Sequence, residues 1–252
     1  MKTDYIATEI RENIGIITIN NPQTLNSINE QTMCALVEQL QKYDQNNLIK
    51  VIVLKGIEQS FVAGLDVKAL AADLGEAKTS IQNMQNYFNL ILRIQKPIIA
   101  AVSGFALGVG CELALACDIV LATDDARFGL PELSLGLLPC FGGCSLLSAR
   151  IGKAKAMDVI LSGKAMSAEE AEQSGLVSRL VTSESLEEEY LKLARRISTL
   201  PQEAVLAAKK VICEQNSVTH IYFENLFSLN RIESEEFRQI LQAYAAKKPS
   251  DA

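Results

Sequence analysis

Short apolar stretches of strand length alternate with amphipathic helical stretches through the first 145 residues of this 252-residue chain. Strands are predicted at residues 14–20, 50–55, 97–103 and 118–124. Helices are predicted at 29–46 and over a stripe from Ile81 to Leu92 that ends before Pro97. The runs Val51–Leu54 and Ile98–Val102 are apolar at every position, which is typical of strands buried on both faces. The alternation predicts an α/β fold.

The pattern changes near residue 150, and the last 100 residues are predicted to be helical. A Ser-Ala-Glu-Glu capping box at Ser167 and a proline at 201 are helix-start signals. We interpret this change as a change of architecture in one molecule, because no low-complexity linker separates the two parts. The predicted helices are 153–161, 167–174, 186–197, 201–213, 219–230 and 233–247.

Composition excludes several classes of protein. Hydrophobic residues make up 48% and charged residues 21%, so a large core can form and disorder is not expected. The net charge of −6 argues against a dedicated nucleic-acid binder. The single histidine, His220, rules out a His-rich metal site, and we expect no metal. No apolar run reaches membrane-spanning length and the N-terminus has no signal core, so we expect a cytoplasmic protein without membrane contact.

The six cysteines form no CxxC pair, and we interpret them as free, buried thiols of a reducing compartment. A metal or redox pair formed by Cys140 and Cys144 is the alternative. Against it, no other potential ligands cluster nearby in the sequence.

Seven of the 14 glycines lie between Gly104 and Gly143, and two carboxylates stand in the same segment. Glu112 lies at the start of an apolar helix, and Glu132 follows Pro131 in a second apolar context. Each could simply cap a nearby helix. Together, two such groups on glycine-rich turns suit acid–base chemistry on a shared water.

Glycine-rich turns before helices also offer backbone N–H groups, and two occur, at Ala63-GLD and Leu107-GVGC. Such amides can polarise a carbonyl when they converge. A dinucleotide-binding loop is the alternative at Gly108, but Leu113 occupies the position of its third glycine.

Four segments closely resemble the crotonase (enoyl-CoA hydratase/isomerase) superfamily. The resemblance spans about residues 5 to 248 and implies a spiral of ββα units followed by helices that trimerise, often as a dimer of trimers. We accordingly divide the chain into a core domain, 1–195, and a C-terminal helical oligomerisation region, 196–252. The segments are NNPQTLNSIN (20–29), SFVAGLDVKAL (60–70), residues 96–139, which include SGFALGVGCELALACD (103–118), and AEQSGLVSRLV (171–181).

The resemblance also implies roles for individual residues. Glu112 and Glu132 match the two catalytic glutamates of the hydratases, with Glu132 as proton donor to C2 and Glu112 orienting or activating water. The amides of Leu65 and Val109 match the oxyanion hole. The matching coenzyme A-binding positions are Ser27, Ala63, Gly64, Lys68 and Lys247.

Three residues depart from the family pattern. Val109 replaces a usual glycine and would resist a positive φ, Cys140 replaces the glycine after Leu-Pro, and Leu65 is larger than the common alanine. They predict a reshaped acyl pocket, lined in part by Cys140.

Because both glutamates are present, the resemblance implies hydration of a 2-enoyl thioester, with no cofactor besides the thioester substrate. The thioester is carried by coenzyme A or by an acyl-carrier protein. Alternatives are another enolate reaction, such as isomerisation or decarboxylation, and non-catalytic binding of acyl-CoA.

Overall fold

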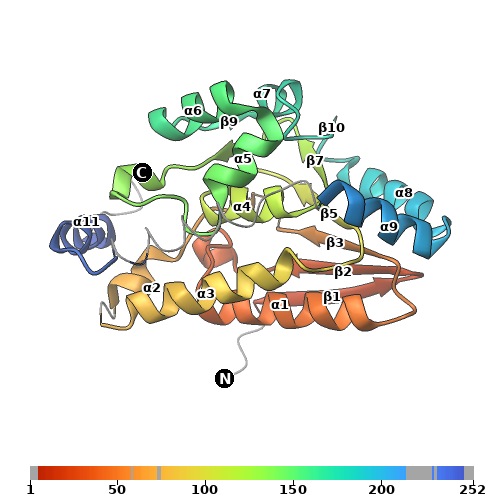
Figure 1. Ribbon diagram of the computed structural model, residues 1–252, viewed down its shortest axis with the longest axis horizontal. Helices are drawn as coiled ribbons and strands as arrows, with labels where there is room; N and C mark the ends of the chain where they lie inside the picture. The colour runs from red at the N-terminus through yellow and green to blue at the C-terminus, as the bar shows by residue number, and fades with distance from the viewer. Residues whose placement is uncertain (1–4, 58, 73–74, 214–228, 230–231, 247–252) are drawn as a thin grey trace.

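The computed structural model describes residues 5–57, 59–72, 75–213, 229 and 232–246. Two sheets organise these residues (Figure 1). The larger has the strand order β1-β2-β3-β5-β7-β10, and the smaller has the order β4-β6-β8-β9. Pairing is parallel except at β1 and β9, which run antiparallel to β2 and β8. The α/β fold predicted from the alternating pattern is therefore confirmed.

The strands follow one another in chain order as β1 (Ile6–Arg11), β2 (Ile14–Ile19), β3 (Val51–Lys55), β4 (Ser60–Val62), β5 (Ile98–Val102), β6 (Phe105–Leu107), β7 (Ile119–Thr123), β8 (Arg127–Gly129), β9 (Met166–Ser167) and β10 (Arg179–Val181). The helices are α1 (Glu30–Gln45), α2 (Val67–Ala72), α3 (Ala77–Ile91), α4 (Val109–Ala116), α5 (Gly143–Ile151), α6 (Lys153–Ser162), α7 (Ala168–Gln173), α8 (Leu186–Ser198), α9 (Gln202–Cys213) and α11 (Glu235–Ala246). Two 3-10 turns are η1 (Pro22–Thr24) and η2 (Glu132–Leu135).

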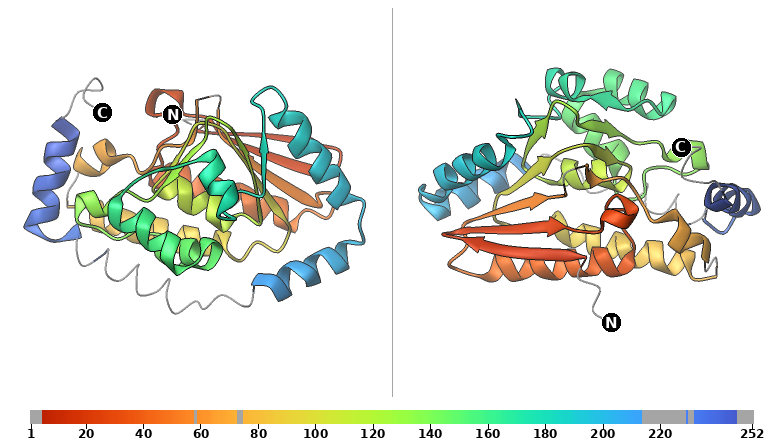
Figure 2. Two further views of the ribbon diagram at one scale, coloured as in Figure 1. Left: turned by 90° about the horizontal axis from the view of Figure 1, so that it is seen from above. Right: turned by 180° about the vertical axis from the view of Figure 1, so that it is seen from behind.

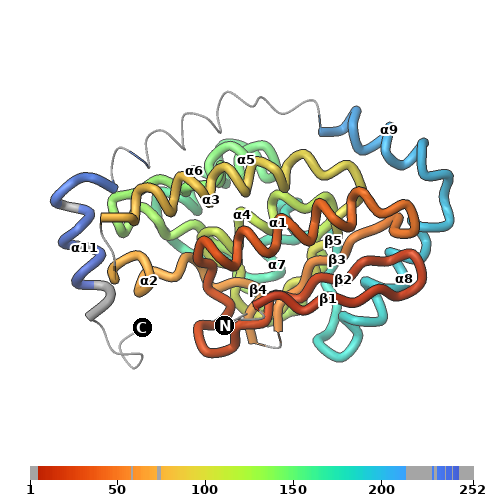
Figure 3. Tube along the Cα trace, turned by 90° about the horizontal axis from the view of Figure 1, so that it is seen from below, coloured from red at the N-terminus to blue at the C-terminus, as the bar shows by residue number. Residues whose placement is uncertain are grey.

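Helices cover both faces of the larger sheet, which explains its uniformly apolar strands. In β3, Ile52 and Leu54 join the main core with α1, α3 and α4, whereas Val51 and Val53 pack with α8 in a second cluster. Helices α1 and α3 run side by side under the sheet (Figure 3). Alternate residues of one strand thus enter two different cores.

Capping residues set the limits of several helices. Asn29 caps α1, because its Oδ1 accepts the Thr32 N–H at 2.9 Å. At the other end of α1, the buried Lys96 ammonium donates to the carbonyls of Tyr43 and Asn46 at 2.8 and 2.7 Å. The capping box predicted at Ser167 is confirmed at the start of α7.

The C-terminal helices lie at opposite ends of the molecule. Helices α8 and α9 flank one end, and α11 lies at the other beside α2 and η2 (Figure 2). Helix α11 contributes Phe237 and Leu241 to the main core. None of the helices within the described ranges is long and apolar enough to cross a bilayer.

The prediction that the last 100 residues are helical is wrong at two short strands. Strand β9 pairs with β8, and β10 pairs with β7, so both sheets are completed from beyond residue 150. Strands β1, β4 and β6 were also not predicted. Strands of two or three residues are too short for a periodic pattern, and only distant pairing defines them. Strand β1 has six residues, but its four central positions are exposed, so it has no buried apolar pattern to detect. The predicted helix 219–230 and His220 lie outside the described residues, and the boundary at residue 195 stays a prediction.

All six cysteines are free, as predicted. Burial is confirmed for Cys111, Cys117 and Cys140 only. Cys213 is exposed at the end of α9, and the remaining two, Cys34 and Cys144, are partly exposed. Among the residues that the structure describes, no group of three or more potential ligands could hold a metal ion.

Candidate active site

Glu112 is fully buried in the first half of α4, and two backbone amides hold its carboxylate. Its Oε1 accepts the N–H of Phe141 at 2.8 Å and that of Gly143 at 2.9 Å. Both amides belong to the glycine-rich segment that leads into α5. Two donors on one oxygen fix the orientation of the carboxylate and stabilise negative charge on it.

Glu132 begins η2 and is 7% exposed. Its Oε1 lies against Gly108, the residue before α4, because a Cβ built on Gly108 would be 2.7 Å from that oxygen. The carbonyl of Gly108 in turn accepts the Glu112 N–H at 3.0 Å. One glycine therefore contacts the backbone of one candidate acid and the carboxylate of the other.

The thiol of Cys111 is affected by both carboxylates. Burial is the main reason that its pKa is raised, and the nearby charges of Glu132 and Glu112 raise this pKa further. Both charges therefore lie close enough to act on the same buried atom, at the N-terminal end of α4.

The two candidate oxyanion amides follow glycines that lie near each other. Gly64 precedes Leu65, Gly108 precedes Val109, and a Cβ on Gly108 would lie 3.8 Å from the Cα of Gly64. Leu65 forms a parallel bridge to Ile28. The Ile28 N–H donates to the Gly64 carbonyl, and the Asp66 N–H donates to the Ile28 carbonyl, each at 2.8 Å. In this pattern the Leu65 N–H points away from Ile28.

Val109 is the first residue of α4, where an N–H has no acceptor within the helix. The resistance of valine to a positive φ has no effect here, because position 109 does not adopt one. The positive φ, +53°, falls on Gly108, and Val109 itself is helical with a buried side chain. The substitution therefore changes packing rather than the direction of the amide.

Three of the predicted coenzyme A-binding residues, Ser27, Ala63 and Gly64, lie together beside Leu65. The segment from Leu25 to Ile28 runs along Ala63 and Gly64, with the Ala63 N–H donating to the Leu25 carbonyl at 3.2 Å. A cavity of about 200 Å³ adjoins this region and is lined in part by Ile28, Asp66 and Met84.

The other predicted binding residues are spread out. Lys68 is exposed on α2, one turn beyond Leu65. Cys140 is buried in the segment that holds Glu112, and its Sγ contacts the Leu138 carbonyl at 3.5 Å. Lys247 lies outside the described residues.

Asn26 is a structural residue of this region that was not predicted. It is fully buried with a φ of +62°, and its Nδ2 donates to the carbonyls of Ser60 and Phe61 at 2.8 and 3.2 Å. Asparagine tolerates this left-handed conformation better than most residues, so its place in a polar turn was the available signal. It ties the turn before α1 to β4.

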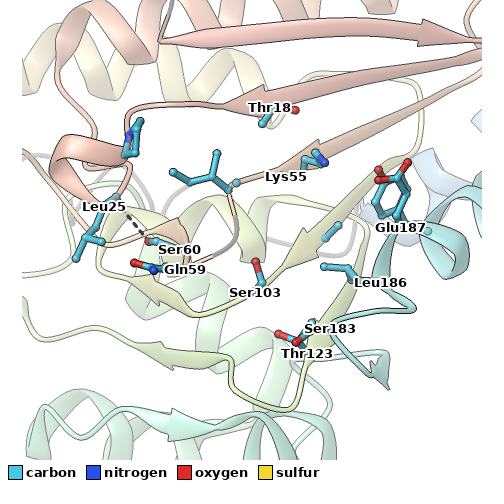
Figure 4. Close-up of a pocket in the computed structure, with 15 residues that line it drawn as sticks. Thr18, Leu25, Lys55, Gln59, Ser60, Ser103, Thr123, Ser183, Leu186 and Glu187 are labelled. Atoms are coloured by element: carbon cyan, nitrogen blue, oxygen red, sulfur yellow. Dashed lines mark hydrogen bonds between the residues drawn. The ribbon is translucent and has the colours of Figure 1, made fainter.

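A cavity of about 690 Å³ lies elsewhere, at the carboxyl ends of β2, β3, β5 and β7 (Figure 4). Thr18, Lys55 and Thr123 line it from the strands, Ser103 lines it from just after β5, and the start of α8 lines it from the other side. Neither candidate glutamate contributes to its wall. This cavity therefore does not reach the two glutamates, although Leu25, which lines it, begins the segment that runs along Ala63 and Gly64.

Comparison with known proteins identifies the family. Residues 9–251 match the enoyl-CoA hydratase/isomerase family. A probable enoyl-CoA hydratase of Rhizobium meliloti (strain 1021) is 37% identical over 100% of this chain and 98% of the relative. The probable enoyl-CoA hydratase echA8 of Mycobacterium tuberculosis is 42% identical over 84% of this chain and 82% of the relative.

Solved structures of the same family have the same fold. An enoyl-CoA hydratase/isomerase of Mycobacterium paratuberculosis superposes with a TM-score of 0.87 at 27% identity, over 95% of this chain and 98% of the other. This chain belongs to the enoyl-CoA hydratase/isomerase family, and the predicted crotonase-type fold is confirmed. The roles predicted for individual residues stay predictions.

Proposed function

We propose that the protein is an enoyl-CoA hydratase that adds water reversibly across the 2,3 double bond of a 2-enoyl thioester. The observation that carries the proposal is the pair of buried carboxylates, Glu112 and Glu132, on either side of Gly108. The hydratase names of the relatives support the same reaction.

The thioester carbonyl oxygen would accept hydrogen bonds from the amides of Leu65 and Val109. These amides follow two glycines that lie near each other, Gly64 and Gly108, which supports a common target. As water attacks C3, negative charge develops on this oxygen, and fixed N–H dipoles stabilise an enolate without reorganisation.

Glu112 and Glu132 would hold one water between them. Glu112 has an oxygen fixed by two amides, which suits a carboxylate that accepts a proton or orients water. Glu132 would deliver the proton to C2. The hydroxyl of the water ends on C3 and a proton from Glu132 ends on C2. The proton that Glu112 takes from the water would then return to Glu132, so both glutamates regain their starting states and the net change is the addition of one water.

Coenzyme A would bind along Ser27 and Ala63–Leu65, where the backbone of two segments lies together. Lys68, exposed at the start of α2, would approach the phosphates, and Lys247 would reach a phosphate from near the C-terminus. The thioester is a substrate, so no separate cofactor is needed. Self-association as a trimer or a dimer of trimers, and a cytoplasmic location, complete the proposal.

A product-resolved assay on short 2-enoyl-CoA thioesters tests the proposal, with Glu112→Gln and Glu132→Gln variants. Loss of a general acid or base lowers turnover by about 10²- to 10⁴-fold. Glu188→Gln, at an exposed position on α8, is the control and should leave turnover unchanged. Full activity of both active-site variants would refute the mechanism. A shifted double bond without added water would indicate an isomerase, and binding without turnover would indicate a non-catalytic protein.

A further inference from the structure

We propose that Gln85 is a positioning residue that sets the carboxylate of Glu112 through a single peptide unit. Gln85 lies on α3 and is 3% exposed. Its Nε2 donates to the carbonyl oxygen of Cys140 at 3.0 Å. The inference rests on the proposed function, because it assigns Gln85 to the orientation of a group placed in that reaction.

The Cys140 carbonyl and the Phe141 N–H belong to the same peptide group, which is planar and trans. The C=O and the N–H therefore point in opposite directions from one rigid peptide plane. On one side Gln85 donates to the oxygen, and on the other the Phe141 N–H donates to Glu112 Oε1 at 2.8 Å. A donor on the carbonyl polarises the peptide and strengthens its N–H as a donor. Gln85 thus acts on both the direction and the strength of the bond to Glu112.

Helix α3 makes a second contact with this segment, through the side chain of Phe88. This residue lies one helical turn beyond Gln85, and its ring packs on that of Phe141 with centroids 5.5 Å apart. The second donor to Glu112 is also closely packed. A Cβ on Gly143 would lie 2.7 Å from Pro139 Cβ and 3.0 Å from Glu112 Oε1. The segment has little room to re-form its two bonds elsewhere.

Packing alone does not explain a glutamine at this position. The neighbouring buried positions of α3 include Ile81, Met84 and Phe88, all apolar. A primary amide in such surroundings is unfavourable unless it forms hydrogen bonds, and the bond to the Cys140 carbonyl is one that it forms. An apolar side chain would fill the space but would leave this carbonyl without the donor.

The test compares Gln85→Met with the parent enzyme. Methionine has a similar length and no donor, so the Cys140 carbonyl loses the hydrogen bond from Gln85 while the core stays filled. We expect kcat on a 2-enoyl-CoA thioester to fall about tenfold, since small errors in position reduce turnover strongly. We expect KM to change less than twofold. Ile81→Val on the same helix is the matched control, because it loosens α3 without touching the Cys140 peptide.

The decisive measurement is the double variant with Glu112→Gln. If Gln85 acts through Glu112, Gln85→Met has no further effect on kcat once Glu112 is replaced. Equal fold-losses in the two backgrounds would overturn the proposal, as would a parent-like kcat in Gln85→Met. Should Gln85→Met not fold, Gln85→Asn replaces it, since it keeps an amide but withdraws the donor by one methylene. If Glu112→Gln alone retains full activity, the proposed function fails instead, so the two failures are distinguishable.

Discussion

Replacing Gly110 by alanine should destabilise the protein, although helix propensity alone predicts the opposite. Gly110 is the second residue of α4, and a Cβ there would lie 2.0 Å from the backbone oxygen of Val62 in β4. Ordinary contact for a Cβ begins at 3.4 Å, so α4 and β4 must separate by 3.4 − 2.0 = 1.4 Å along this direction. The obstacle is backbone, which has no rotamer to change.

The two effects have opposite signs and different sizes. Alanine improves intrinsic helix stability by about 1 kcal/mol. Overpacking in a core, backbone shifts included, typically destabilises by about 1–3 kcal/mol. Because the obstacle here is backbone, we take the upper end of that range and expect a net loss of about 2 kcal/mol in the free energy of unfolding. Because α4 carries Val109 and Glu112, a shift of this size should also lower turnover about 100-fold.

Urea unfolding followed by circular dichroism measures the first quantity, and the hydration assay measures the second. Gly163→Ala is the control, because a Cβ there meets nothing within 4 Å. It leaves only the strain of a φ of +67°, which is about 1–2 kcal/mol. A Gly110→Ala protein as stable and active as the parent would refute the argument that helix and strand are in backbone contact.

Three further predictions concern stability and the accessibility of thiols. Lys209→Met should lower the free energy of unfolding by about 2 kcal/mol in urea titrations, because Lys209 Nζ pairs with Asp118 Oδ2 at 2.7 Å where both side chains are largely buried. Burial raises the pKa of Tyr190 to about 12. The folded state then keeps a proton that the unfolded state releases from about pH 10, so stability should fall by up to about 2–3 kcal/mol between pH 10 and 12. In Tyr190→Phe, stability should fall less between pH 10 and 12 than in the parent. The same dependence of stability on pH in both proteins would contradict this prediction. A thiol reagent at pH 8 should label the exposed Cys213 in the folded protein and Cys111 only after unfolding, as read by peptide mass spectrometry.

The strands of the larger sheet that were predictable are those with uniform local patterns. Apolar runs at β3 and β5 and the helical stripe of α3 are local signals, and the structure confirms them. Strand β10 has three residues, Arg179–Val181, none fully buried, and its pairing with β7 cannot be read from its own composition.

The residues of the candidate site also include some that the sequence could predict and some that it could not. Glu112 and Glu132 could be singled out because a carboxylate in an apolar segment is unusual. The donors to Glu112 could not, since Phe141 and Gly143 are 29 and 31 residues away and nothing local links them. Gln85 could have been noticed, because it is a polar residue four positions after Ile81 on a helix stripe that is otherwise apolar. The atom to which it donates is the backbone oxygen of Cys140, and a backbone oxygen has no sequence signature.

The order of strands in the larger sheet has a consequence for synthesis. From β2 onward, each strand of this sheet pairs with the preceding one in chain order, through β3, β5 and β7 to β10. A nascent chain leaving the ribosome can therefore add strands at one growing edge, N-terminal part first. Glu112 is made before Phe141 and Gly143, so its carboxylate cannot accept hydrogen bonds from these two amides until about 30 more residues have been made. The two donors to Glu112 therefore become available only after β2, β3, β5 and β7 have been made, and before β10.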